Sequence, residues 1–268
     1  MSLTDVFRSR ALCVALGPEL LSAVVRSGSR IVAHSEVRVD PDYPGEPWQG
    51  ALAAFGAYLR QAGVTLRGVP VSVSISTRWC QLAMVPWSDA LLHEGSAARY
   101  QQAHFAGVYG DAARRWSIVS DDAAYGEPRL ACAIEREFID GLQAIAREHG
   151  HPCIAVESIL SIAARAIGPG KHEAMAVIEP GRLVLAALAG GRIVAVQSQP
   201  CSGAWHAELP RAWQRWLLRT PELGDIAQVA LVSLDEHVAP SEVPAPFEAV
   251  ALPSPLAPGY AAVTMMGC

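Results

Sequence analysis

The chain carries one apolar pattern twice, at residues 14–33 (VALGPELLSAVVRSGSRIVA) and again, 162 positions further on, at residues 176–195 (AVIEPGRLVLAALAGGRIVA). Seven of the nineteen positions aligned from Ala15 on are identical without a gap: Pro18/Pro180, Leu21/Leu183, Gly28/Gly190, Arg30/Arg192, Ile31/Ile193, Val32/Val194 and Ala33/Ala195. In both copies two apolar runs flank a turn that contains glycine, which is typical of a β-hairpin. A repeat of this length exceeds the ~20–50 residues of a solenoid unit. The pattern therefore predicts two related halves, each opening on a hairpin.

The segments around the hairpins alternate between strand-like and helical patterns. We expect strands at residues 69–76, 79–87, 114–121, 129–135, 152–156 and 226–233. We expect helices at residues 49–62, 88–105, 136–150, 157–170 and 204–220. A proline-rich stretch from Pro240 to Pro258 separates the last of these strands from the terminal YAAVTMM. The alternation predicts an α/β protein.

Composition excludes several classes of protein. A hydrophobic content of 51% in 268 residues predicts a folded chain, and no uncharged apolar run approaches the ~20 residues of a membrane-spanning helix. With 21 basic and 26 acidic residues, Lys171 as its single lysine and no block of basic residues, the chain is expected to have neither a phosphate-binding basic surface nor a nucleic acid partner. We expect a cytoplasmic protein. Its six cysteines lack metal spacing, and we expect no metal, no disulfide, and buried thiols at Cys13, Cys132 and Cys153.

Four stretches, residues 11–32, 98–122, 129–167 and 174–200, resemble in their order the type IV pilus assembly protein PilM and the cytoplasmic domain of the type II secretion protein GspL. Both belong to the actin-like ATPase superfamily. The resemblance implies an α/β, actin-like fold of two duplicated ribonuclease-H-like lobes with reduced inserted subdomains. Residues 1–70 and 71–165 would form the first lobe, with the inserted subdomain at about 71–135, and residues 166–268 a shortened second lobe. A ribonuclease-H-like domain pair of another family is the competing interpretation.

The two turns depart from the family pattern at the positions that hold nucleotide. PilM-like chains resemble D-I-G-S-S-S in the first hairpin and D-I-G-A-S-T in the second, where an Asp holds a metal-bound water and turn amides and hydroxyls contact phosphate. This chain reads ALGPEL from Ala15 and VIEPGR from Val177, so both Asp positions are apolar. The altered turn positions are Ala15, Gly17, Pro18, Val177, Glu179, Gly181 and Arg182.

These substitutions work against phosphate binding. Pro18 and Pro180 lack amide donors, and the carboxylates of Glu19 and Glu179 would repel phosphate. Arg182 could attract an anion, but an exposed arginine in a turn is more often solvated. The Gly-Gly turn expected under adenine is replaced by LDEHVAPS at residues 234–241. We therefore expect a pseudo-ATPase with no catalytic residue, no metal and no cofactor.

By resemblance, the chain would be a non-catalytic cytoplasmic scaffold of a type IV pilus or type II secretion apparatus, peripheral to the inner membrane through its partner. The partner would be an inner-membrane assembly protein of the PilN or GspL/GspM type, whose cytoplasmic tail docks beside the inserted subdomain. Trp79, Trp87 and Tyr100 are the candidate peptide-binding residues. The alternatives are an actin-like ATPase or small-molecule kinase with an atypical nucleotide site, and a divergent actin-like regulator.

Three further clusters have both a structural and a functional interpretation. Glu148, His149 and His151 could hold a metal, but they lie at a predicted helix end, where histidine stabilises the dipole. Cys201, Ser202 and His206 lack the sequence context of a nucleophile elbow. Trp213 and Trp216 share one helix face, and we expect that face to be core, with a docking strip as the alternative. The structural interpretation is the expectation for all three.

Overall fold

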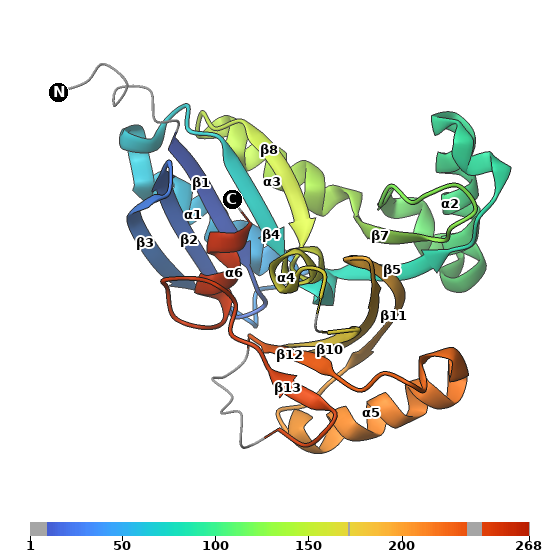
Figure 1. Ribbon diagram of the computed structural model, residues 1–268. Helices are drawn as coiled ribbons and strands as arrows, with labels where there is room; N and C mark the ends of the chain where they lie inside the picture. The colour runs from blue at the N-terminus through green and yellow to red at the C-terminus, as the bar shows by residue number, and fades with distance from the viewer. Residues whose placement is uncertain (1–9, 171, 235–242, 268) are drawn as a thin grey trace. The chain divides into compact units, whose positions relative to one another are not determined.

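The computed structural model describes residues 10–170, 172–234 and 243–267, and the chain divides into two compact units (Figure 1). Unit 1 comprises Met1–Ser76, Phe138–Ile162 and Leu252–Cys268, and unit 2 comprises Thr77–Glu137 and Ala163–Ala251. This division differs from the expected lobes in three places. Residues 77–137 and 163–165 group with the second half of the chain, and residues 252–268 group with the first half.

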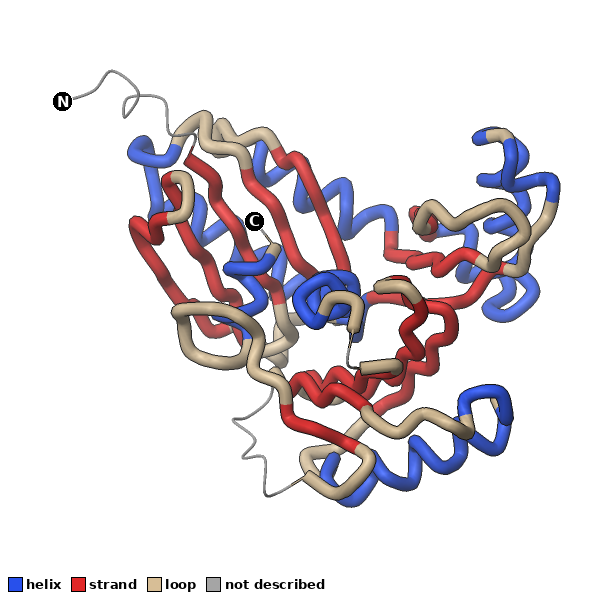
Figure 2. The backbone as a smooth tube through the Cα atoms, viewed as in Figure 1, coloured by secondary structure: helices blue, strands red, loops and turns tan. Residues whose placement is uncertain are grey.

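Unit 1 is built on a five-stranded sheet in the order β3-β2-β1-β4-β8. Its strands are β1 (Arg10–Leu16), β2 (Leu20–Ser27), β3 (Arg30–Arg38), β4 (Val71–Ile75) and β8 (Cys153–Ser158). The strands β1, β2 and β3 form an antiparallel meander, while β4 and β8 run parallel to β1. Figure 2 shows helices beside this sheet. They are α1 (Gln49–Ala62), α3 (Arg136–Glu148), the start of α4 (Ile159–Ile167) and α6 (Tyr260–Met266).

Helices α1 and α3 of unit 1 pack closely because small residues lie between them. The rings of Trp48 and Phe138 stack with their centroids 5.3 Å apart at the start of the two helices. Gly141 of α3 lies so close to Leu52 that a β-carbon would approach its side chain to 2.6 Å. The absence of a side chain at position 141 therefore allows α3 to lie this close to Leu52 of α1.

Unit 2 repeats the sheet of unit 1. Its order is β11-β10-β9-β12-β13, with an antiparallel meander followed by two strands parallel to β9. The strands are β9 (Ala174–Glu179), β10 (Arg182–Ala189), β11 (Arg192–Pro200), β12 (Val229–Ser233) and β13 (Phe247–Ala249). The two sheets share strand order and direction, so the prediction of two related halves is confirmed.

The duplication extends to single residues. Both hairpins contain a bulge at the equivalent position, where Val32 of β3 and Val194 of β11 have no partner in the strand pairing. The turns that precede these bulges, between β2 and β3 and between β10 and β11, each place a glycine in the left-handed region, Gly28 with φ 61° and Gly190 with φ 58°. An extra residue in one strand strengthens the local twist, and glycine takes positive φ without a Cβ penalty.

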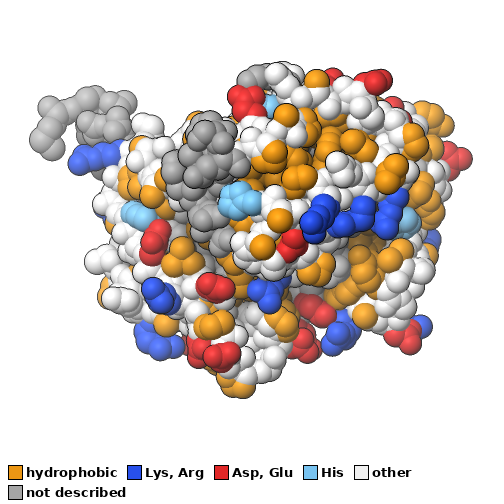
Figure 3. Space-filling view, turned by 90° about the horizontal axis from the view of Figure 1, so that it is seen from below, with side chains coloured by type: hydrophobic (Ala, Val, Ile, Leu, Met, Phe, Trp, Pro, Cys, Tyr) orange, Lys and Arg blue, Asp and Glu red, His pale blue; other side chains and the backbone are white. Residues whose placement is uncertain are grey.

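Helix α5 (Trp205–Arg219) covers the sheet of unit 2 and buries Trp205, Trp213 and Trp216 in its core. The expected assignment of Trp213 and Trp216 to the core is therefore confirmed. Pro210 lies inside this helix. The surface viewed in Figure 3 carries acidic and basic side chains interspersed with apolar ones.

The inserted segment of unit 2 forms a third sheet in the order β5-β7-β6. Its strands are β5 (Cys80–Val85), β6 (Trp116–Ser120) and β7 (Arg129–Glu135). One face packs against α2 (Glu94–Tyr109) through a small core that includes Phe105 and Trp116. Short 3-10 helices complete the chain: η2 (Gly63–Leu66), η3 (Thr77–Trp79), η4 (Asp89–Leu92), η5 (Gly110–Arg115) and η6 (Pro221–Leu223).

Several local expectations need correction. Strand β13 and helix α6 were not among the expected elements, and α2 begins at Glu94 rather than at residue 88, where Ser88 instead caps η4. Cys132 and Cys153 are only partly buried. Neighbouring residues of a strand point to opposite faces, so Ala131 and Ala133 face the core and Cys132 does not.

Cys13 is buried but disulfide-bonded, so the expectation that no disulfide forms is wrong. Cysteine spacing in one sequence does not reveal which residues meet in space. Within the described residues, no helix combines the length and the apolar character that crossing a membrane requires.

Candidate functional site

The first turn, between β1 and β2, has little hydrogen-bonding capacity left for a ligand. The Gly17 amide already donates to the Leu20 carbonyl (2.8 Å), and Pro18 has no amide hydrogen. Ala15, at the predicted metal position, is fully buried in β1 and pairs with Ser22 and Ser74 on the neighbouring strands. The turn therefore presents only the exposed Glu19 side chain at its tip.

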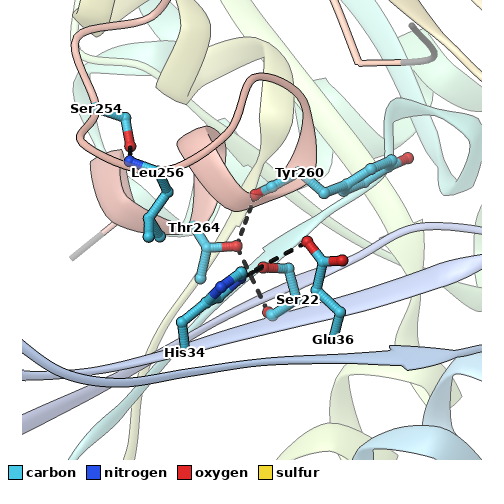
Figure 4. Close-up of polar contacts among 7 residues, drawn as sticks. All are labelled: Ser22, His34, Glu36, Ser254, Leu256, Tyr260 and Thr264. Carbon is cyan, nitrogen blue, oxygen red and sulfur yellow. Dashed lines mark hydrogen bonds and ion pairs between the residues drawn. The ribbon is translucent and has the colours of Figure 1, made fainter.

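The space over this first turn is occupied by the C-terminal helix of unit 1. A β-carbon on Gly17 would overlap the phenol ring of Tyr260, the first residue of α6. The helix is held on the sheet by Thr264, whose hydroxyl lies 3.5 Å from the Ser22 carbonyl and 2.7 Å from the Tyr260 carbonyl (Figure 4). The absence of a Cβ at Gly17 thus permits the close approach of an aromatic ring.

The second turn, between β9 and β10, is built by Pro180 and Gly181, the latter with φ 77°. Glu179 precedes the turn and is 1% exposed. Its Oε1 accepts a hydrogen bond from the Thr77 amide at 3.0 Å and a second, very short one from the Thr77 hydroxyl. A carboxylate therefore caps the start of η3, an arrangement usual for anions at helix starts.

Two arginines lie beside this carboxylate. Arg182 donates from Nη2 to the Arg78 carbonyl at 3.3 Å, and a β-carbon on Gly181 would lie 3.0 Å from Nη1 of Arg78. Burial lowers the pKa of the Arg182 guanidinium, while the Glu179 carboxylate acts in the opposite direction. The Glu179 carboxylate thus supplies negative charge beside Arg182 from within the chain.

The altered turn positions form two separate groups. Ala15, Gly17 and Pro18 lie in unit 1, and Val177, Glu179, Gly181 and Arg182 lie in unit 2. Val177 is fully buried in β9, so neither predicted metal position carries an oxygen ligand. Among the described residues, no three His, Cys, Asp or Glu side chains are grouped as a metal site would require.

Sequence reasoning missed the two residues that complete these turns. Thr77 directly follows the predicted strand at residues 69–76, and a threonine at that position predicts only a turn. Tyr260 lies near the C-terminus, about 240 residues from Gly17, and no local pattern links the two. A buried glutamate within the apolar run AMAVIEP was the available signal, because such a group requires a hydrogen-bonding partner.

The three predicted peptide-binding residues lie in different environments. Trp79 is buried, with 8% of its surface exposed, at the end of η3. Tyr100 of α2 packs against the small core of the inserted sheet. Trp87 is half-buried and lies against Tyr125, which is 76% exposed, with the ring centroids 4.7 Å apart. The pair Trp87 and Tyr125 is therefore an accessible aromatic feature of this segment, and Tyr109 of α2 is also exposed (37%).

Two residues of the remaining clusters, His151 and Ser202, make hydrogen bonds within the chain. His151 is buried, with Nδ1 2.9 Å from the Val69 carbonyl oxygen. The Ser202 hydroxyl donates to Glu208, and the Ala204 amide donates to Ser202, so this serine organises the start of α5. Hydrogen bonds from Ser202 lower the pKa of the Glu208 carboxyl.

The fold matches solved structures of the actin-like class. It resembles the cytoplasmic domain of EpsL, an inner-membrane component of the type II secretion system of Vibrio cholerae, with a TM-score of 0.62, 13% identity, and coverage of 96% of this chain and 93% of that one. It also resembles a PilM-PilN type IV pilus biogenesis complex, with a TM-score of 0.62, 17% identity, and coverage of 84% and 82%.

A third match is a Bacteroides thetaiotaomicron protein of unknown function with an actin-like ATPase fold, with a TM-score of 0.56, 11% identity, and coverage of 90% and 88%. No protein-family model matches the sequence, and no curated protein matches it. The chain therefore has the two-lobed α/β actin-like fold that the sequence predicted.

Proposed function

We propose that this chain is a non-catalytic scaffold of a type II secretion or type IV pilus assembly apparatus. The fold similarity to EpsL and to PilM supports the kind of apparatus. One observation supports the proposal that the scaffold is non-catalytic. Residues of the chain itself occupy each turn that would contact nucleotide. Tyr260 lies over Gly17, and the Glu179 carboxylate is hydrogen-bonded to Thr77.

The expected consequence is an absence of nucleotide binding. A phosphate at the second turn would have to displace a buried carboxylate from two hydrogen bonds and would meet its negative charge. Calorimetric titration with millimolar Mg-ATP should therefore give no saturable heat. Saturable binding that is lost in Arg182→Ala would refute the proposal and favour an ATPase or kinase with an atypical site.

The proposed partner is the cytoplasmic segment of a single-span inner-membrane protein of the PilN or GspL/GspM type, which would keep the chain at the cytoplasmic side of that membrane. The inserted sheet supports this proposal because Trp87 and Tyr125 form an accessible aromatic pair, and such residues anchor peptides. Tyr100 and Trp79 would contribute to packing within the same unit.

The partner is tested by capture of that cytoplasmic segment on immobilised protein. Trp87→Ala should weaken capture at least tenfold because an aromatic anchor is lost. Tyr43→Ala removes an exposed aromatic residue (43%) from unit 1 and serves as the control. Equal capture by both folded variants would place the binding site elsewhere.

A further inference from the structure

Strand β3 is the end strand of the sheet in unit 1 within the described residues, and it is more exposed than the other strands of that sheet. Only Ile31 and Val37 of its nine residues are even partly buried. Long exposed edges are hazardous because they pair with other chains, and proteins normally cover or interrupt them. An edge of this length that stays open therefore needs an explanation.

The equivalent end strand of unit 2, β11, is covered by other strands of that unit. Strand β11 contacts β5 and β7 of the inserted sheet, and Arg192 at its start donates to Asp121 at 3.0 Å. The duplicated sheets thus share strand order, bulge and turn, yet the chain covers one outer strand and leaves the other accessible.

The backbone of β3 has unused hydrogen-bonding groups along its outer side. The Val39 amide donates to the Glu19 carbonyl at 2.9 Å, which fixes the alternation: residues 33, 35 and 37 bond to β2. The N–H and C=O groups of His34, Glu36 and Arg38 consequently point away from β2. They can accept an additional strand.

A groove of about 630 Å³ runs beside this edge, between β3 and the end of α1 with η2. Its apolar lining includes Val25, Val32, Ala33, Val37 and Leu66. Val32 is the bulged residue and is 52% exposed. The groove has room for apolar side chains, which alternate positions of an added strand would direct into it.

The charge of this region differs from that of the whole chain. The strands β1, β2 and β3 carry five charged side chains, of which four are arginines (Arg10, Arg26, Arg30 and Arg38) and one is Glu36. The chain as a whole has a formal net charge of −5. Such a local reversal attracts an acidic partner and repels a basic one.

We propose that β3 binds an extended peptide segment of an assembly partner, acidic and with apolar residues at alternate positions, which adds to the sheet as a sixth strand. Main-chain hydrogen bonds to His34, Glu36 and Arg38 supply affinity, the groove selects apolar side chains, and the arginines select acidic ones. This inference does not depend on the state of the two hairpin turns.

The test uses the full chain and three fluorescent ten-residue peptides. The first alternates aspartate with valine, the second alternates lysine with valine, and the third is the acidic peptide with alternate amides N-methylated. Anisotropy should show saturable binding of the first peptide alone, weakened about tenfold or more when salt rises from 50 to about 300 mM. Equal binding of the basic or N-methylated peptide overturns the proposal, as does failure of the acidic peptide to bind.

Two variants locate the site. His34→Pro removes an outward amide without breaking a main-chain hydrogen bond to β2, although it also removes the contact of His34 Nε2 with Ser22 (3.3 Å), and it should weaken binding about tenfold. Arg30→Glu should weaken it similarly, whereas Arg211→Glu, an exposed arginine of α5 in unit 2, is the control and should change nothing. Unchanged affinity in both folded β3 variants would overturn the proposal.

Hydrogen exchange gives an independent readout. The amides of residues 34, 36 and 38 should exchange rapidly in the free protein and slow at least tenfold with the acidic peptide bound. Protection that instead increases with protein concentration, without peptide, would indicate pairing of two copies through β3. That result would overturn the assignment to a partner peptide.

Discussion

Replacement of Glu179 by glutamine tests the central contact of the second turn. The carboxylate is 1% exposed and accepts two hydrogen bonds from Thr77, one from the amide and one from the hydroxyl. Glutamine keeps the size and shape of the side chain but removes the charge. The substitution therefore separates the contribution of the charge from that of packing.

The expected loss of unfolding free energy follows from the two hydrogen bonds between Thr77 and Glu179. A bond to a charged acceptor contributes about 1.5–3 kcal/mol and a neutral one about 1 kcal/mol. The neutral amide oxygen of glutamine retains part of this, so we expect Glu179→Gln to lower the free energy of unfolding by about 2–3 kcal/mol. For a protein of this size that corresponds to a fall in Tm of roughly 4–12 °C.

Thermal and urea unfolding followed by circular dichroism would measure these changes. Glu19→Gln is the matched control, because Glu19 is exposed at the tip of the first turn, and it should change stability by less than about 0.5 kcal/mol. Thr77→Val removes the hydroxyl donor from the same contact. The double variant should therefore be less destabilised than the sum of the single variants.

A stability of Glu179→Gln within about 0.5 kcal/mol of the parent would show that the charge contributes nothing to this contact. Strict additivity of Thr77→Val and Glu179→Gln would show that the two groups act separately. Either result would remove the structural basis for regarding the second turn as filled by its own carboxylate.

Three further predictions follow from the packing. Gly17→Ala should cost about 1–3 kcal/mol through overlap with the ring of Tyr260, and a double-mutant cycle with Tyr260→Ala should show coupling, whereas additive costs would contradict the contact. Trp213→Ala should cost about 3–5 kcal/mol in urea unfolding, whereas the control Leu218→Ala, at a residue 83% exposed, should cost less than about 0.5; similar costs would contradict the core assignment. A hydrogen bond with Cys132 of β7 and burial raise the pKa of the Cys80 thiol well above 9.0. The contribution of this thiol to stability is therefore complete below the unfolded pKa and should be lost as pH rises above about 9. A Cys80→Ala variant whose unfolding free energy falls equally at alkaline pH would contradict this.

The sequence predicted those parts of the molecule that depend on local patterns. Apolar periodicity and turn glycines identified both hairpins, and the ungapped alignment paired Val32 with Val194, which occupy the same bulge in the structure. That Ala15 and Val177 are apolar also needed no coordinates. Alternation and turn chemistry act over a few residues, so a single chain displays them directly.

The tertiary structure decided which groups fill the two turns and which edge stays open. Thr77 meets Glu179 across 102 positions, and Tyr260 meets Gly17 across most of the chain. Strands β3 and β11 begin with the same four residues, RIVA, and this shared start does not distinguish the accessible strand from the covered one. Such pairings arise when the sheets and helices pack, because burial selects partners by position in space and local propensity carries no information about distant residues.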